Sequence, residues 1–336
     1  MQDAARGLWL AAFLAAVSLW YAVAMSSKGF YLAQVLPPDF VLLIGALFAV
    51  CVWCGDPWAG AFLAYVIVRM FFTPQIGGLN RPTWATIGLG IYACARSVRP
   101  QWMRSVRWTA VGVAAVESVW LIGFAFHRWP FAWWRWSGAT MGNANFAAAF
   151  IAIASPWAPA WLLVLLGLGV LASKSALGAL AFSAAVCLRW RCQAWVLSLA
   201  AVIAAGTVWW RGVDTTSVAL RAAIWRWGLA TWFHDGLVFG KGIGAWTVLQ
   251  PGIAQADNPF LRAHNEFLQL GFDGGLVALA LVALWVWSHR ASWRRPEAAA
   301  LLAAIGIESF GMFPFHVPGV AVLALIALGD ATRGEP

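Results

Sequence analysis

The residues best suited to chemistry lie in one short stretch near position 264. Residues 262–269 read RAHNEFLQ, and residues 273–275 read DGG. An imidazole beside an amide and a carboxylate can accept a proton from a hydroxyl group, or can orient that hydroxyl by hydrogen bonding. The stretch makes His264 a candidate for either role. The simpler alternative is an interfacial histidine with no chemical role.

Two stretches upstream supply cations. Arg221 and Trp225 are four residues apart, which places both side chains on one face of a helix. Residues 240–244 read GKGIG, and a glycine-rich turn that contains a lysine can hold a phosphate through backbone N–H groups. The turn lacks the Lys-Ser/Thr ending of a nucleotide-binding loop, so we do not expect it to bind nucleotide.

Two polar stretches complete the set. Residues 142–146 read GNANF and contain Asn143 and Asn145, and residues 313–318 read FPFHVP and contain His316. Asparagine commonly caps helices. Its amide is both donor and acceptor, so it also suits sugar hydroxyls. The sequence leaves both roles open for the two asparagines.

The elements that must position these residues are predicted to be membrane helices. Of 336 residues, 62% are hydrophobic and 10% are charged, whereas soluble domains carry about 25% charged residues. Mean hydropathy is +0.75, and the 25 tryptophans are typical of aromatic belts at membrane interfaces. Apolar runs recur along the whole chain. We therefore expect an all-α, polytopic membrane protein that forms one domain over residues 1–336.

Apolar patterning predicts about twelve membrane helices. Several are shorter than the ~20 residues of a perpendicular span, so their limits are approximate. The net charge of +9 is scattered between them, which argues against nucleic acid as a partner. The predicted helices cover residues 8–25, 40–54, 58–72, 83–95, 108–126, 146–156, 160–172, 175–188, 194–210, 266–287, 298–311 and 317–330.

The basic loops predict the orientation, because cytoplasmic loops carry an excess of arginine and lysine. With twelve helices and cytoplasmic termini, three arginine-rich loops fall inside. The cysteines lie at helix ends assigned to the same side, where thiols stay reduced. The pair at 51 and 54 has no second pair, so we expect no metal site. The arginines are Arg96, Arg99, Arg104 and Arg107, then Arg189 and Arg191, then Arg290, Arg294 and Arg295, and the cysteines are Cys51, Cys54, Cys94, Cys187 and Cys192.

The longest loop, residues 211–265, falls on the outer face and holds most of the candidate residues. A loop of this length in a compact protein is usually functional, and we expect it to be compact with short helices. The cations on this face oppose the positive-inside rule. They therefore predict an anionic ligand: Lys28, Arg81, Arg128, Arg135, Lys174, Arg211, Arg221, Arg226, Lys241 and Arg262.

Taken in order, these stretches resemble the O-antigen ligase and O-antigen polymerase superfamily, which also includes bacterial protein O-oligosaccharyltransferases. The family pattern runs from Gly-Asn-Pro-Asn-Phe through Ser-Arg-Gly, Arg-x-x-x-Trp, Gly-x-Gly and His-Asn-x-x-Leu-Gln to Phe-Pro-x-x-x-Pro. The resemblance covers residues 138–320. The matching positions are Gly142–Phe146, Ser173-Lys174-Ser175, Arg221 with Trp225, Gly240–Gly244, His264–Gln269 with Asp273 and Gly275, and Phe313–Pro318.

The resemblance implies a metal-independent, inverting glycosyltransferase without a cofactor. It would move a glycan from a polyprenyl-diphosphate carrier to a hydroxyl of a glycolipid or a growing glycan in lipopolysaccharide biosynthesis, at the periplasmic face of a bacterial inner membrane. His264 would activate the acceptor, with Asn265 or Asp273 orienting the imidazole, and Arg221 would bind the diphosphate. The other donor-binding residues would be Asn143, Asn145, Lys174, Trp225, Arg226, Lys241, Arg262 and His316.

Two other functions fit parts of the sequence. A transporter or flippase of lipid-linked glycans would also have many spans and outer cations. It should place ionisable residues near mid-membrane, where Arg69 and Glu117 are the clear candidates, although a structural pairing of these two is the simpler interpretation. A purely structural membrane subunit leaves the outer-loop stretches unexplained. The acceptor stays open among lipid A-core, a growing polysaccharide and a protein hydroxyl.

Overall fold

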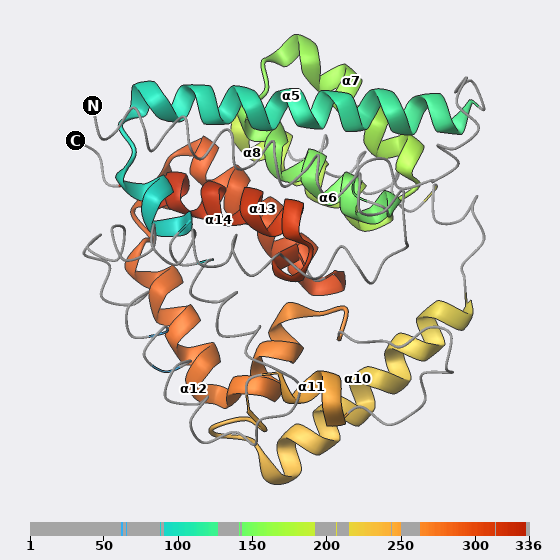
Figure 1. Cartoon of the computed structure of the whole chain (residues 1–336), viewed down its shortest axis with the longest axis vertical. Helices are drawn as coiled ribbons and strands as arrows, with labels where there is room; N and C mark the ends of the chain where they lie inside the picture. The colour runs from blue at the N-terminus through green and yellow to red at the C-terminus, as the bar shows by residue number, and fades with distance from the viewer. Residues whose placement is uncertain are drawn as a thin grey trace, which may run out of the picture.

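The computed structural model shows a helical chain, drawn in Figure 1. It describes residues 62, 65, 88, 91–126, 141, 143–191, 206, 215–242, 244–249, 263–312 and 314–333. All regular structure within these residues is α-helix or 3-10 helix, so the expected all-α class is confirmed for them.

Prolines set the start of several helices. Pro100, Pro296 and Pro318 each stand in a first helical turn, where the missing N–H group has no helical partner to lose. The elements, in chain order, are α5 (Pro100–Ala125), α6 (Ala144–Ala154), η3 (Ser155–Trp157), α7 (Ala160–Ser173), α8 (Ala176–Trp190), α10 (Thr215–Asp235), α11 (Ala245–Leu249), α12 (Glu266–Ser288), η4 (Ser292–Arg294), α13 (Pro296–Gly311), η5 (Pro314–His316) and α14 (Pro318–Ala331).

Most predicted spans within the described residues correspond to a helix. One limit differs: the predicted span 108–126 is the end of α5, which begins earlier, at Pro100, so Arg104 and Arg107 lie on a helix and not in a loop. The spans that agree within a few residues are 146–156, 160–172, 175–188, 266–287, 298–311 and 317–330. The spans that lie wholly or largely outside the described residues are 8–25, 40–54, 58–72, 83–95 and 194–210.

Among the described helices, α5 and α12 are long and apolar enough to cross a membrane, judged by length and composition. Other apolar helices are shorter: Ala144–Trp157, Ala160–Ser173, Ala176–Trp190 and Gly319–Ala331. These lengths are compatible with membrane association, and the twelve-span arrangement stays a prediction.

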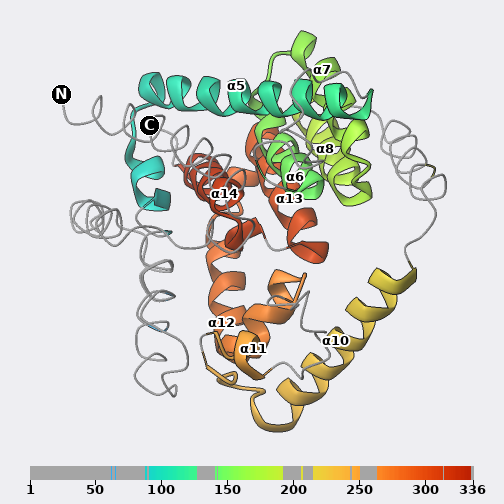
Figure 2. The same ribbon diagram turned by 45° about the vertical axis from the view of Figure 1, so that its right-hand side comes forward.

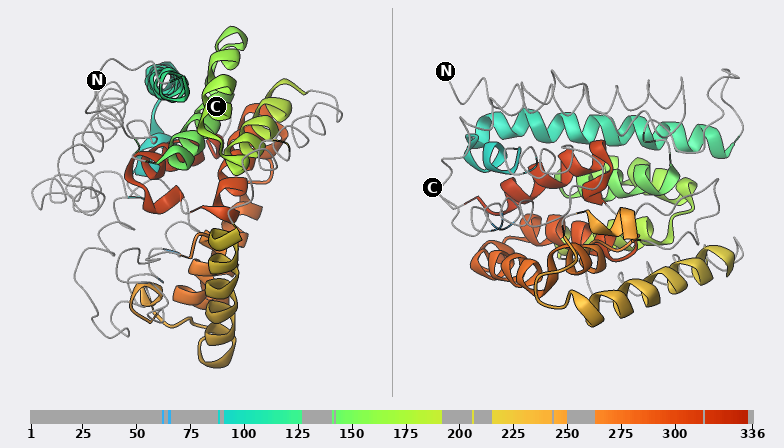
Figure 3. Two further views of the ribbon diagram at one scale, coloured as in Figure 1. Left: turned by 90° about the vertical axis from the view of Figure 1, so that its right-hand side faces the viewer. Right: turned by 60° about the horizontal axis from the view of Figure 1, so that its bottom comes forward.

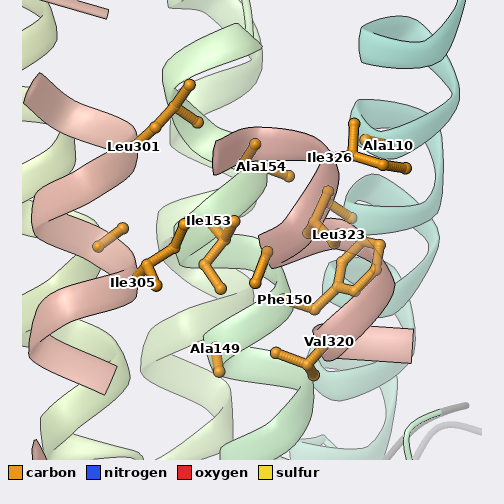
Figure 4. Packing of buried hydrophobic residues seen from close by; sticks show 14 of the residues in the cluster. Ala110, Ala149, Phe150, Ile153, Ala154, Leu301, Ile305, Val320, Leu323 and Ile326 are labelled. Atoms are coloured by element: carbon orange, nitrogen blue, oxygen red, sulfur yellow. The ribbon is translucent and has the colours of Figure 1, made fainter. Parts of the chain in front are cut away.

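Helix α6 lies at the centre of the bundle. All its residues from Phe146 to Ala154 are buried, and α5, α7, α8, α13 and α14 pack around it. Its small side chains allow close approach: a Cβ built on Gly178 of α8 would lie only 2.5 Å from that of Ala148. Figure 4 shows Ile153 of α6 between side chains of α13 and α14, and Phe150 beside Val320 and Leu323 of α14.

The arginine-rich segments meet at one end of this bundle. Arg107 of α5 lies 2.9 Å from Glu297 at the start of α13 and 2.8 Å from Asp330 at the end of α14. Arg189, near the end of α8, reaches the same Glu297 at 3.5 Å, and Arg295 donates to a backbone carbonyl at the end of α14 at 2.6 Å. We call these five residues the arginine end. Arginines from all three predicted cytoplasmic loops therefore lie together in space.

The opposite ends of α8, α13 and α14 meet the start of α12 around the turn between α13 and α14. Glu266, the first residue of α12, accepts a hydrogen bond of 3.0 Å from the backbone N–H of Phe315. Gly311, at the end of α13, lies so close to Leu177 at the start of α8 that a Cβ on the glycine would be 3.0 Å from that side chain. We call these four residues the motif end. The candidate stretches that it gathers are 143–146, 173–175, 264–269 and 314–318.

Helix α12 is broken at Gly275, whose φ of 68° and ψ of −169° are not helical. Beyond the break, the N–H groups of Leu276 and Val277 donate to the carbonyls of Leu237 and Val238, at 2.9 and 3.1 Å. A Cβ at position 275 would lie 2.2 Å from the carbonyl oxygen of Val238, so only glycine fits. The turn after α10 thus packs into the break, and α10, α11 and the first part of α12 form a separate layer beside the bundle (Figures 1, 2 and 3).

Candidate functional site

The site begins where α10 meets the segment that leads into α12. The indole N–H of Trp225 donates a 2.6 Å hydrogen bond to the carbonyl of Ala263. Both residues belong to a small apolar cluster between the two elements. The bond places Arg221, one turn earlier on α10, beside His264, where the guanidinium charge acts on the imidazole. Two stretches separated by about forty residues in the sequence are therefore brought together, as the resemblance implies.

His264 is partly buried beside Arg221, and these surroundings keep its imidazole neutral. Burial, and then the positive charge of Arg221, lower the pKa of His264 from 6.5 to about 4. Its backbone is left-handed, with φ of 53°, a conformation that costs a non-glycine residue about 1 kcal/mol or more. Near neutral pH the side chain is therefore a proton acceptor beside a fixed cation.

The residues just after His264 attach it to the rest of the fold. Asn265 caps α12, because its side-chain oxygen accepts the N–H of Leu268 at 2.9 Å. Gln269, which is buried, accepts the N–H of Ala263 at 3.1 Å. Together with the Glu266–Phe315 bond of the motif end, these contacts fix the backbone on both sides of the imidazole. Asn265 therefore caps α12. The resemblance implies a second role, in which Asn265 orients the imidazole of His264, and that role stays a prediction.

Glu266 and Gln269 belong to the stretch 262–269, but the sequence predicts no role for either side chain. The signal that points to them is their polarity: they are the charged and amide side chains in the apolar first turns of α12. Glu266 also lies at a helix N-terminus, where a carboxylate is favoured by the helix dipole and by nearby N–H groups. Its partner is 49 residues away, so the sequence gives no indication of the contact.

Asp273 has a structural role in the glycine-rich turn. Its two carboxylate oxygens accept the backbone N–H groups of Gly244 at 3.0 Å and Trp246 at 2.9 Å. Its carbonyl oxygen accepts the N–H of Gly242 at 2.9 Å. The turn therefore does surround an anion, as its composition suggests, but that anion is the carboxylate of Asp273. These N–H groups are used inside the protein, which corrects the expectation that they hold a phosphate.

Lys241 also has a partner within the chain. Its Nζ lies 2.8 Å from Oδ2 of Asp235, and the side chain of His234 is hydrogen-bonded to the other oxygen of that carboxylate. The hydrogen bonds from Lys241 and then from His234 lower the pKa of Asp235 below its usual value. Lys241 therefore stabilises the end of α10, and the structure gives it a role different from the expected donor contact.

Arg226 faces away from the imidazole. It is exposed, whereas Arg221 is partly buried. Five residues along a helix correspond to a rotation of about 140°, so the two arginines lie on different sides of α10. The structure brings Arg221 to His264 and leaves Arg226 on the outer side of the helix.

The two asparagines and Lys174 lie at the ends of bundle helices. Asn143 caps α6, since its side-chain oxygen accepts the N–H of Asn145 at 2.8 Å. Lys174 ends α7 in a left-handed conformation, and its side chain is exposed. The adjacent Ser175 caps α8 by accepting the N–H of Gly178. Helix capping therefore explains the presence of Asn143 and Ser175 at the motif end.

The structure describes only the backbone of His316 and does not describe Arg262, the last two residues expected to bind the donor. His316 belongs to η5, directly after Phe315, so its backbone lies at the motif end. Arg262 lies outside the described residues. The pair at Cys51 and Cys54 also lies outside them.

No family model matches the chain, and neither a curated protein nor a solved structure matches it.

Proposed function

We propose that this protein is a membrane glycosyltransferase that moves a glycan from a polyprenyl-diphosphate carrier to an acceptor hydroxyl. The observation that carries the proposal is the pairing of Arg221 with a neutral His264 at the motif end of the helices. A fixed cation and a neutral imidazole are the two groups that this reaction needs. The resemblance of the sequence stretches to O-antigen ligases and polymerases supports the same reaction.

The proposed reaction is a single displacement. The acceptor oxygen forms a bond to the anomeric carbon while the bond from that carbon to the diphosphate oxygen breaks. The electron pair leaves with the diphosphate, whose growing charge Arg221 stabilises by charge-assisted hydrogen bonds. The proton of the acceptor hydroxyl passes to a ring nitrogen of His264. Attack from the side opposite to the leaving group inverts the anomeric centre.

The low pKa of His264 defines what the imidazole contributes. A base with a pKa of about 4 does not remove a proton from a free alcohol. It accepts the proton as the new carbon–oxygen bond forms, when the hydroxyl has become acidic, and it orients the hydroxyl before that. The resulting imidazolium, next to Arg221, loses its proton readily, so the site resets for another turnover.

The position in the membrane follows the same proposal. The arginine end faces the cytoplasm under the positive-inside rule, and the motif end then faces the periplasmic side of a bacterial inner membrane. The donor diphosphate would lie at that surface, with its polyprenyl chain in the bilayer. The acceptor class is a glycolipid or a growing glycan.

The test is a transfer assay with purified protein in nanodiscs, a polyprenyl-diphosphate-linked glycan and candidate acceptors. We expect the wild-type protein to form a new glycosidic linkage and His264→Ala to bind the donor without transfer. His289→Ala is the matched control, because His289 lies at the other end of α12, and it should keep activity. A His264→Ala protein that transfers glycan at the wild-type rate would refute the mechanism.

A transporter of lipid-linked glycans is the second candidate, and buried carboxyl groups favour it. Glu117 of α5 and Glu308 of α13 are fully buried. An ionisable side chain in the interior of a helical membrane protein often marks a transport pathway. Movement of the donor between leaflets without a new glycosidic bond, lost in Glu308→Gln, would support this function instead. Arg69, the other candidate for such a pathway, lies outside the described residues.

A further inference from the structure

The end of α10 and the turn that follows it expose large apolar side chains. Phe233 is 59% exposed and Phe239 is 58% exposed, and Leu229, Leu237 and Val238 are also exposed. Leu229 and Phe233 are four residues apart and so lie on the same side of the helix. We call these five residues the apolar tip. Exposed apolar side chains gathered in this way indicate an interaction surface.

The apolar tip is not the side of α10 that packs in the protein interior, because the opposite side of α10 is the buried one. Trp232 packs against α12, where a Cβ on Gly271 would lie 2.5 Å from its ring. Gly228 lies equally close to the ring of Trp246. These contacts pack α10 against α11 and α12, so the side chains on the other side of α10 point away from the protein.

The apolar tip continues the apolar surface of α12. The carbonyls of Leu237 and Val238 accept hydrogen bonds from the first two residues beyond the break in α12. The first of these, Leu276, is itself 46% exposed. Since α12 is long and apolar enough to cross a membrane, a surface continuous with its exposed side meets the same surroundings.

Polar groups border the apolar tip on the same helix. Arg226 is exposed one turn before Leu229, and the Asp235–Lys241 ion pair follows Phe233. A cation next to exposed leucine and phenylalanine suits the boundary of a bilayer. There an arginine can reach the lipid phosphates while neighbouring apolar side chains enter the acyl region.

We propose that the apolar tip inserts among the acyl chains of an anionic phospholipid bilayer at its outer face, with Arg226 at the headgroup phosphates. Residues 215–242 then lie along the membrane interface, with the exposed side chain of His234 towards water. This placement holds Arg221 and His264 near the depth of lipid phosphates. The inference goes beyond the transferase proposal and does not require it.

The experiment measures depth in the bilayer directly. A nitroxide label is placed at Phe239→Cys or Val238→Cys in full-length protein whose native cysteines are serine, in vesicles of phosphatidylethanolamine and phosphatidylglycerol. Oxygen concentrates in hydrocarbon, and a nickel chelate stays in water. We expect labels at both positions to be relaxed several-fold more by oxygen than by the chelate. The control is His234→Cys, in a side chain that is 84% exposed and polar, which should favour the chelate.

A second control separates this inference from membrane insertion as a whole. Leu284→Cys lies on the exposed side of α12 and should report hydrocarbon in any membrane-spanning arrangement. If Leu284 reports hydrocarbon while positions 238 and 239 are as accessible to the chelate as 234, docking of the apolar tip is overturned. If all four positions are accessible to the chelate, membrane insertion of α12 fails too. The measurement needs no donor and no turnover, so it is independent of the transfer assay.

Discussion

The indole of Trp225 is hydrogen-bonded to the carbonyl of Ala263 across 38 residues of chain, at 2.6 Å. This bond joins the helix that carries Arg221 to the backbone immediately before His264. This bond, together with the apolar cluster around it, sets the distance between the proposed leaving-group cation and the proposed base.

Trp225→Phe keeps an aromatic ring but removes the N–H donor. We expect a loss of about 1 kcal/mol in the free energy of unfolding. Turnover should fall by roughly tenfold to a hundredfold, because small displacements of reacting groups are costly. Trp287→Phe, at an exposed position of α12, is the control and should change neither quantity. Normal turnover in Trp225→Phe would show that the bond does not position the site.

Arg221→Ala should remove the charge-assisted contact with the donor diphosphate. We expect a fall of roughly a hundredfold in the rate of transfer at normal protein level, equivalent to a few kcal/mol. Arg221→Lys should recover only part of the rate, since an ammonium group cannot form the two-pronged contact of a guanidinium. Arg290→Ala, exposed near the arginine end, should transfer normally. The idea fails if both variants at position 221 retain full activity.

The neutral form of His264 predicts the acid limit of activity. Because its pKa is lowered to about 4, transfer should be flat from about pH 8 down to about pH 5 and decline below that as the imidazole gains a proton. A rate–pH profile in the nanodisc assay measures this limit. A half-maximal point near pH 6.5 would show that the imidazole is not held in a buried, cationic environment.

Folding stability should respond to the same group. A histidine whose pKa is about 4 in the folded protein and about 6.5 unfolded contributes stability that is complete above pH 6.5 and lost as pH falls towards 4. The loss is on the order of 3 kcal/mol at the acid end. In thermal unfolding between pH 7 and pH 4.5, His264→Gln should lose less stability than wild type. Parallel curves for the two proteins would contradict the low pKa.

The break in α12 gives a steric prediction with a matched control. Gly275→Ala places a Cβ 2.2 Å from the carbonyl oxygen of Val238, in a backbone conformation with φ of 68°. We expect this variant to lose several kcal/mol of stability or to misfold. Gly112→Ala, where a Cβ meets nothing within 4 Å, should be neutral or slightly stabilising in a helix. Equal melting temperatures for the two variants would show that the break is not needed.

Membrane orientation can be tested with introduced cysteines in a background without native ones. Cys94 and Cys187 are buried, so they would stay unlabelled on either side of a membrane and cannot report orientation. His234→Cys and Arg290→Cys are exposed and lie in the predicted outer and inner regions. We expect an impermeant maleimide to label position 234 in intact cells and position 290 only after lysis. The reverse pattern would place the site on the cytoplasmic side.

The sequence by itself determined the local features of this protein. Prolines at 100, 296 and 318 start helices, and Asn143, Ser175 and Asn265 cap them, because both effects act within a few residues. The pairing of Arg221 with His264 was also expected, from the order of stretches that resemble a family. Twelve spans, the donor and the acceptor remain predictions.

Only the tertiary structure decided which polar groups already have a hydrogen-bond or ion-pair partner within the protein. The GKGIG turn has the composition of a phosphate cradle, yet Asp273, which lies 29 residues from Gly244, occupies it. Lys241 resembles a donor-binding cation, yet Asp235 neutralises it. Glu266 contacts Phe315 and Gly275 breaks α12 because chain segments distant in sequence pack there. A buried polar group takes the partner that folding brings within hydrogen-bonding distance, and spacing along the chain does not reveal that partner.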